Sequence, residues 1–140
     1  GARAVLLIAA VLSAQALERL AGQARRLGLQ VLVEVHDEQE LAAALAAEPD
    51  LVGINNRDLT TFQVDPGRVA RLLPVVPARV PVVAESGYRR PQEVRQALAQ
   101  GAVGVLVGEA LMRCADPRAF LWAVMTGQPE MEGVDAAAAS

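Results

Sequence analysis

The sequence contains no lysine, so all 13 of its basic residues are arginines. Aromatic residues make up only 3% of the 140 residues, which means that a core has to be built from aliphatic side chains. The single cysteine, Cys114, excludes an internal disulfide and favours a reducing, cytoplasmic compartment. A net charge of −3 argues against nucleic acid or an anionic membrane as the partner. No apolar run has the length of a membrane-spanning helix.

Two kinds of cofactor site also lack their usual sequence signals. No group of His, Cys, Asp and Glu residues has the spacing of metal ligands. No G-x-G-x-x-G opens a helix, so a dinucleotide fingerprint is absent. We therefore expect neither a metal nor a cofactor. His36 is the only histidine, and we expect it to be hydrogen-bonded at the end of a strand rather than to act as a general base.

Five apolar runs alternate with helical patterns along the chain. Their starts are 26, 21, 29 and 22 residues apart, which is typical of βαβ units that build a parallel sheet. We predict an α/β domain over 1–127, a partial (β/α) barrel of the TIM type, followed by a disordered tail over 128–140. The predicted strands are 4–9, 30–36, 51–56, 80–85 and 102–107.

Capping residues predict where the helices begin and end. Ser13 is expected to cap a helix that stops at Gly28, and Asp37 with Glu40 has the spacing of a capping box. The apolar stretch 121–125 is expected to lie in the core. Proline is expected at the first position of three further helices. These prolines are Pro66, Pro91 and Pro117.

Polar side chains gather at the carboxyl ends of three successive predicted strands. Alternation along 30–36 places its valines on one face, which suits a layer of helices, and Glu34 on the other face. Asn55 and Glu85 occupy the same inner face near the ends of the next two strands. A charged residue on this face is costly unless it is paired or hydrated, so the set indicates a functional site.

Two turns in consecutive βα units predict an anion site. The runs at 83–88 and 104–112 are apolar strands that end in polar or glycine-rich turns and lead into helices. Such turns place main-chain N–H groups and a helix N-terminus around one anion. This is the geometry of the phosphate site after strands 7 and 8 of a (β/α)8 barrel.

Four motifs in register resemble the indole-3-glycerol phosphate synthase family. They are Val-Glu-Val-His-Asp-Glu, Gly-Ile-Asn-Asn-Arg-Asp-Leu, Ala-Glu-Ser-Gly and Val-Gly-Glu-Ala-Leu-Met-Arg, at 33–38, 53–59, 84–87 and 107–113. The resemblance covers roughly residues 1–125 and places 5–8 in the family's fourth strand. It implies a carboxy-lyase of tryptophan biosynthesis that closes an indole ring with loss of carbon dioxide and water.

The resemblance also implies roles for individual residues. Glu34 would be the acid/base residue, and Asn55 would orient hydroxyl and amine groups of the substrate. Arg57 would pair with the substrate carboxylate through its planar guanidinium. Glu85 would hold charge near the developing iminium.

The binding residues implied by the resemblance lie in the turns and on the inner face. Ser86, Gly87, Gly108 and Glu109 would line the phosphate site, mainly through main-chain N–H groups. We expect the Glu109 side chain to point away, because a carboxylate beside a phosphate is unfavourable. The substrate's aromatic ring would be padded by Leu6, Ile8 and Leu106.

The resemblance implies a departure as well. The family's first three strands supply two lysines and a further glutamate, whereas this chain contains no lysine and a whole barrel takes about 250 residues. We expect a fragment, with a split barrel or a degenerate paralogue as alternatives, and no turnover by the chain alone. The expected partners are a phosphorylated small molecule and either a barrel segment on another chain or a second copy at the open sheet edges. Another ribulose-phosphate-type barrel enzyme and a non-catalytic phosphate-binding module remain alternative functions.

Overall fold

The computed structural model describes residues 1–128, and it contains one five-stranded parallel sheet with strand order β1-β2-β3-β4-β5. The predicted disordered tail, apart from its first residue, lies outside the described residues. The strands are β1 (Ala4–Ile8), β2 (Gln30–Val35), β3 (Leu51–Asn55), β4 (Val82–Glu85) and β5 (Gly104–Leu106). The helices are η1 (Ala9–Val11), α1 (Ala14–Arg26), α2 (Glu38–Ala46), α3 (Arg68–Leu72), η2 (Leu73–Val75), α4 (Pro91–Ala99), α5 (Glu109–Arg113) and α6 (Pro117–Thr126). The predicted α/β fold with five βα units is confirmed.

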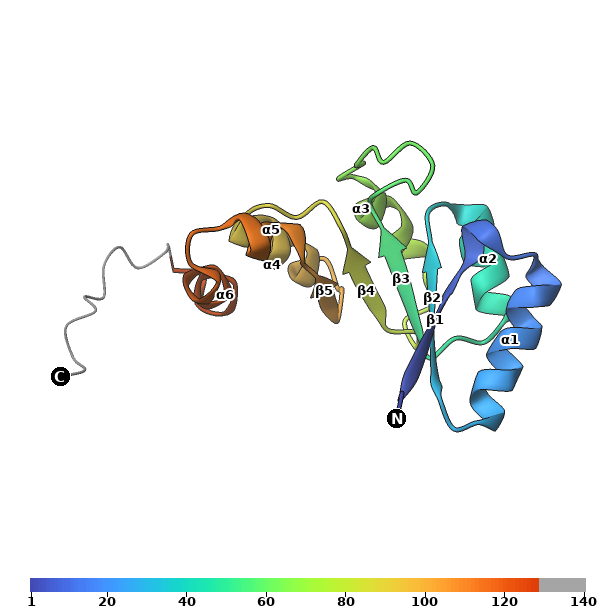
Figure 1. The fold of residues 1–140 in the computed structure, drawn as a ribbon. Helices are drawn as coiled ribbons and strands as arrows, with labels where there is room; N and C mark the ends of the chain where they lie inside the picture. Colours follow the sequence, from blue (N-terminus) through green and yellow to red (C-terminus); the bar gives the residue numbers. More distant parts are fainter. Residues whose placement is uncertain (129–140) are drawn as a thin grey trace.

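Helices cover one face of the sheet (Figure 1). The core lies between them and the aliphatic face of the strands, where Val31, Val33 and Val35 of β2 are fully buried. Leu17 of α1 and Leu41 of α2 pack into the same cluster. The valine face of β2 is therefore the helix-facing one, as the alternation predicts. Within residues 1–128, no helix is long and apolar enough to cross a membrane.

The predicted caps are confirmed at most helix ends. Ser13 Oγ accepts a hydrogen bond from the Ala16 N–H, and α1 ends just before Gly28, whose φ is 73°. Pro91 and Pro117 each occupy the first position of a helix. The prediction for Pro66 is wrong, since α3 begins only at Arg68.

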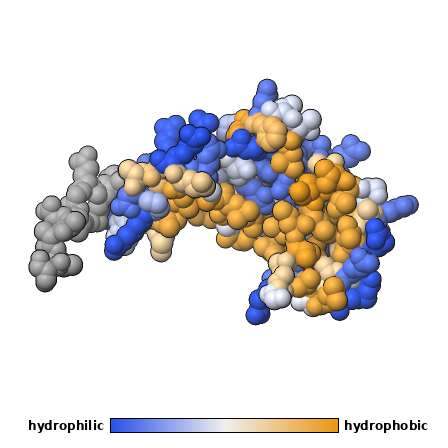
Figure 2. Space-filling model, viewed as in Figure 1, coloured by the Kyte–Doolittle hydropathy of each residue, from blue (hydrophilic) through white to orange (hydrophobic). Residues whose placement is uncertain are grey.

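The sheet's other face carries exposed hydrophobic side chains. Leu6 on β1 and Leu106 on β5 are 50% and 54% exposed. Figure 2 shows hydrophobic residues gathered across the region of the strands. Each of the two outer strands, β1 and β5, has one edge that no strand of residues 1–128 covers. Both features match the inner wall of an open partial barrel.

Two expectations about burial are wrong. Residues 121–125 were expected in the core, but Leu121, Trp122 and Met125 are 48%, 47% and 81% exposed, because α6 buries mainly Phe120 and Ala123. Alternation along the predicted strand 102–107, read in the same way as along 30–36, predicts that Val103, Val105 and Val107 face the helices, and for Val103 this is wrong. Val103 lies one residue before β5 begins and is 63% exposed.

Candidate active site

Strand register brings the three predicted catalytic side chains together. Glu34 lies beside Gly53 in the β2–β3 ladder, and Asn55 lies beside Glu85 in the β3–β4 ladder. Partners in a parallel ladder point to the same face, and so do residues two apart on one strand. All three polar side chains therefore meet on the open face at the carboxyl ends of the strands, where each is at most 5% exposed.

Glu34 has polar neighbours on two sides. Asn55 Nδ2 donates a hydrogen bond of 3.1 Å to Glu34 Oε1. His36 Nε2 lies 3.3 Å from the same oxygen. The Asn55 amide oxygen in turn accepts from the Arg57 N–H at 2.9 Å, which fixes the amide orientation. Asn55 therefore orients Glu34 directly and is itself oriented by the chain that follows β3.

Glu85 fills space that Gly53 leaves open. A Cβ built on Gly53 would overlap the Glu85 carboxylate at Oε1. That oxygen is buried and has no hydrogen-bond partner among the described residues. Burial, followed by the nearby Glu34 charge, raises the pKa of Glu85 from 4.5 to about 7. At neutral pH this carboxyl group is therefore able both to give and to take a proton.

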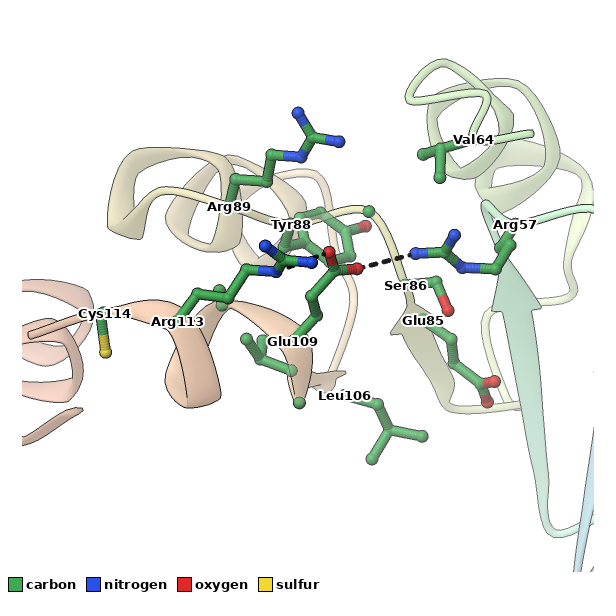
Figure 3. A pocket seen from close by; sticks show the side chains of 14 residues that line it. Arg57, Val64, Glu85, Ser86, Tyr88, Arg89, Leu106, Glu109, Arg113 and Cys114 are labelled. Atoms are coloured by element: carbon green, nitrogen blue, oxygen red, sulfur yellow. Dashed lines mark hydrogen bonds and ion pairs between the residues drawn. The ribbon is translucent and has the colours of Figure 1, made fainter. Parts of the chain in front are cut away.

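Arg57 and Glu109 form an ion pair across the mouth of the site (Figure 3). Arg57 Nη2 lies 3.0 Å from Glu109 Oε2, and Arg113 Nε lies 3.0 Å from Glu109 Oε1. The expectation that the Glu109 side chain points away is wrong, because two arginines compensate its charge. Arg57, predicted to bind a substrate carboxylate, binds a protein carboxylate in this structure.

The two predicted phosphate turns line one pocket of about 920 Å³. Ser86 and Gly87 come from the turn after β4, and Gly108 and Glu109 come from the turn after β5. The main-chain N–H groups of these four residues donate no hydrogen bond within residues 1–128. The pocket also contains Arg57, Arg89 and Arg113, so it offers both free N–H donors and positive charge to an anion.

The turn after β4 depends on unusual backbone angles. Ser86 and Gly87 both have left-handed φ values, 62° and 82°. Glycine is required at position 87 for a second reason, since a Cβ there would overlap Val64 Cγ1. This pair of left-handed residues turns the chain at the end of β4, beside the pocket that both residues line.

Asn56 supports this turn, and the sequence analysis assigned it no role. It is 2% exposed, its Nδ2 donates to the Ser86 carbonyl at 3.2 Å, and its Oδ1 accepts from the Val69 N–H. The main chain of Asn56 bonds to Glu85 and Asp65. An asparagine at the end of a buried strand was the available signal, but its partners lie 13 and 30 residues away in the sequence.

The predicted ring-binding residues lie on the open face, although not all in the pocket. Ile8 is the β1 neighbour of Glu34, and Leu106 is the β5 neighbour of Glu85. Leu106 lines the pocket, whereas Leu6 and Ile8 lie farther along the face, on β1. Across residues 1–128, no group of three or more His, Cys, Asp or Glu side chains is arranged to hold a metal ion.

Comparison with known proteins identifies the family. The family model described as indole-3-glycerol phosphate synthase matches residues 1–124. This chain belongs to the indole-3-glycerol phosphate synthase family. The resemblance drawn from the four sequence motifs is therefore confirmed.

Two relatives show how much of the family protein this chain covers. An indole-3-glycerol phosphate synthase of Kineococcus radiotolerans is 48% identical over 118 residues, which are 84% of this chain and 43% of the relative. The Bordetella pertussis protein of the same name is 49% identical over 117 residues, 84% of this chain and 45% of the relative. The synthase-family chain thus spans under half the length of these curated relatives.

Solved structures of other proteins share the fold. The 3-hexulose-6-phosphate synthase from Salmonella typhimurium aligns with a TM-score of 0.72 at 19% identity, over 89% of this chain and 60% of that one. The thiamine phosphate pyrophosphorylase from Pyrococcus furiosus aligns with a TM-score of 0.67 at 22% identity, over 88% and 57%. At these identities the likeness concerns the parallel α/β architecture alone.

Proposed function

We propose that this chain carries the acid/base and phosphate-binding part of an indole-3-glycerol-phosphate synthase. The reaction closes the indole ring of 1-(2-carboxyphenylamino)-1-deoxyribulose 5-phosphate, with loss of carbon dioxide and water. The observation that carries the proposal is the convergence of Glu34, Asn55 and Glu85 at the carboxyl ends of β2, β3 and β4. A sheet that served only stability would gain nothing from two buried carboxyl groups there.

Glu34 and Glu85 have different roles in this proposal. Glu34, held by Asn55, moves the proton during ring closure and dehydration. Glu85 has a pKa raised to about 7 by burial and by Glu34, so it is present in both protonation states near neutrality. Its ionised form stabilises positive charge that develops on the substrate nitrogen. Two carboxyl groups in unlike surroundings can thus serve two functions.

We propose that the substrate phosphate binds between the turns after β4 and β5. The support is the set of four free N–H groups at Ser86, Gly87, Gly108 and Glu109 in one pocket. In the same pocket, the substrate carboxylate replaces the Glu109 carboxylate on Arg57. Glu109 then retains its second partner, Arg113, so the exchange leaves no unpaired charge.

The test supplies the rest of the barrel. The chain is fused to, or co-expressed with, the segment of the Bordetella pertussis relative that it does not match, and indole-3-glycerol phosphate is followed by fluorescence. We expect activity in the completed barrel, none in the 140-residue chain alone, and a fall in kcat of roughly 10²-fold or more for Glu34→Gln.

Glu38→Gln provides the matched control, since Glu38 lies on the exposed side of α2 and its replacement removes the same charge. It is expected to retain full activity. A completed barrel that tolerates Glu34→Gln within a few-fold would place the base elsewhere, and Glu85 would be the next candidate.

We propose that a barrel segment covers the open face and pairs with the free edges of β1 and β5. Exposed Leu6 and Leu106 on that face support this proposal. Light scattering of the chain with and without the segment tests it: a one-to-one complex is expected, and a homodimer that excludes the segment would contradict it. We propose that the assembly is cytoplasmic, because Cys114, the single cysteine of this chain, is free.

A further inference from the structure

The ring of His36 lies between two carboxylates just after β2 ends. Its Nε2 atom is 3.3 Å from Glu34 Oε1, and its Nδ1 atom is 3.1 Å from Glu40 Oε2 on α2. The ring is largely enclosed, with a side-chain exposure of 10%, whereas that of Glu40 is 20%. Among residues 1–128, the acidic groups around the ring are these two glutamates, with Glu85 beyond Glu34.

Glu40 determines which ring nitrogen carries a proton. Its Oε2 accepts the main-chain N–H of His36 at 2.8 Å, while the Asp37 side chain caps the Glu40 N–H. In the predicted capping box, the Glu40 carboxylate would accept the main-chain N–H of Asp37. In the structure it accepts the main-chain N–H of His36 instead. An ionised carboxylate only accepts hydrogen bonds, so the nearby Nδ1 has to be the donor. A neutral ring held in this way carries no proton on Nε2.

The unprotonated Nε2 of His36 lies beside Glu34, the proposed acid/base residue. It is buried, makes no hydrogen bond with any of the described residues, and has Glu34 Oε1 as its acidic neighbour. A lone pair that faces an ionised carboxylate oxygen is repulsive, and one proton between the two atoms removes the repulsion. The 3.3 Å separation places the two atoms within reach of one shared proton.

We propose that His36 is a positioning residue that stores the proton Glu34 takes up. Glu34 in its acid form gives the proton on Oε1 to Nε2, which leaves a carboxylate and an imidazolium. The Nδ1 proton remains on the ring in its hydrogen bond with Glu40, and the reverse step returns the stored proton to Glu34. In the stored state both ring nitrogens carry a proton, and each nitrogen lies beside one carboxylate.

This inference rests on the proposed acid/base role of Glu34 and deepens it. If Glu34 kept the proton that it takes up in the first transfer, it could not act as a base in the next step. With His36 as the store, Glu34 is a carboxylate again before the second transfer, and the same proton is available when an acid is required. The inference thus gives a function to the imidazole of His36, which follows β2.

NMR on the 140-residue chain tests the proton arrangement without any need for activity. His36 is the only histidine, so one pair of ring ¹⁵N signals reports it without ambiguity. We expect the neutral ring to carry its proton on Nδ1 in the parent chain. Glu40→Gln should shift the majority to the Nε2–H form. Glu34→Gln should lower the fraction of doubly protonated ring at a fixed pH by at least about threefold.

Glu38→Gln is the control, because it removes an equal charge from the same turn of α2 without contacting the ring. It should leave both readings unchanged. An Nε2–H majority in the parent chain would overturn the proposal. So would a Glu34→Gln variant whose ring protonation matches the parent at every pH, because the proton would then not be shared.

Kinetics of the completed barrel provide the second reading. His36→Gln should lower kcat by about tenfold or more and leave KM unchanged, because the ring acts on Glu34 and not on substrate binding. A completed barrel with an intact His36 but no turnover would contradict the proposed function, and the NMR result would stand apart from it. An active barrel in which His36→Gln changes nothing would refute the proton store alone.

Discussion

Replacing Glu85 by glutamine should stabilise the chain at alkaline pH and leave its stability unchanged at acid pH. Glutamine has the size of a protonated carboxyl group and carries no charge, so it mimics the protonated form of Glu85. The buried side chain lies against Gly53, and its Oε1 has no partner among the described residues. Ionising Glu85 in this buried position destabilises the folded chain, and an uncharged glutamine avoids that destabilisation.

The size of the effect follows from the pKa shift. Burial first, and the Glu34 charge second, raise the pKa of Glu85 from 4.5 to about 7. That shift corresponds to at most about 3 kcal/mol, and solvent screening at the open face reduces the expected value to about 1–2 kcal/mol. Between these two pKa values the folded chain binds a proton that the unfolded chain has lost. The free energy of unfolding therefore falls as pH rises from about 4.5 through 7.

Urea denaturation at pH 5, 6, 7 and 8 measures the effect. The free energy of unfolding of Glu85→Gln minus that of the parent should be smallest at pH 5, just above the pKa in the unfolded chain, and should reach about 1–2 kcal/mol at pH 8. Glu18→Gln on α1 is the control, because Glu18 is exposed and the change removes the same charge. A difference that is constant across this range, or that is larger at pH 5, would refute the argument that Glu85 is forced toward its acid form.

Four further substitutions test the site. Gly53→Ala should cost about 1–3 kcal/mol of unfolding free energy in urea denaturation, because its Cβ overlaps the Glu85 carboxylate; unchanged stability would contradict the packing. Asn56→Ala should cost about 2–3 kcal/mol, read from thermal melts, because the Ser86 carbonyl and the Val69 N–H lose their partner. Gly108→Val should abolish phosphate-induced amide shifts with little loss of stability, since a Cβ there meets no atom within 4 Å. Ser86→Ala should weaken phosphate binding by about 1.5–3 kcal/mol. If Gly108→Val bound phosphate as well as the parent chain, this site would be excluded.

The sheet could be predicted from the sequence because its signals are local. Runs of valine with period two predict the strands, and the predicted ends differ from the observed ones by at most two residues. The error at Pro66 has a local cause too. Asp65 Oδ1 accepts the Gly67 N–H, so the Asp-Pro pair forms a turn before the helix instead of its first residues. A side-chain acceptor followed by proline is compatible with both structures, and the sequence does not distinguish them.

The site was less predictable where charges from distant segments meet. Sequence reasoning placed Glu109 away from the pocket because it considered only the repulsion of a bound phosphate. Arg57 lies 52 residues earlier in the chain, and its guanidinium reverses that conclusion. Asn56 was missed for the same reason, since its two amide contacts join β3 to segments that lie far apart in sequence. Alternation along a strand indicates the face of a side chain but not the partner that it finds there.

The distribution of polar residues across the sheet argues that the site has been selected at the expense of stability. Val33 and Val52 on the helix-covered face are wholly buried and have apolar neighbours, as a sheet built for packing requires. The open face departs from this pattern at the carboxyl ends of β2, β3 and β4, where Glu34, Asn55 and Glu85 are enclosed. Each departure comes with an accommodation: Gly53 leaves room for Glu85, and Asn55 donates to Glu34. Costly groups whose surroundings are shaped to retain them are the expected signature of chemistry at this end of the sheet.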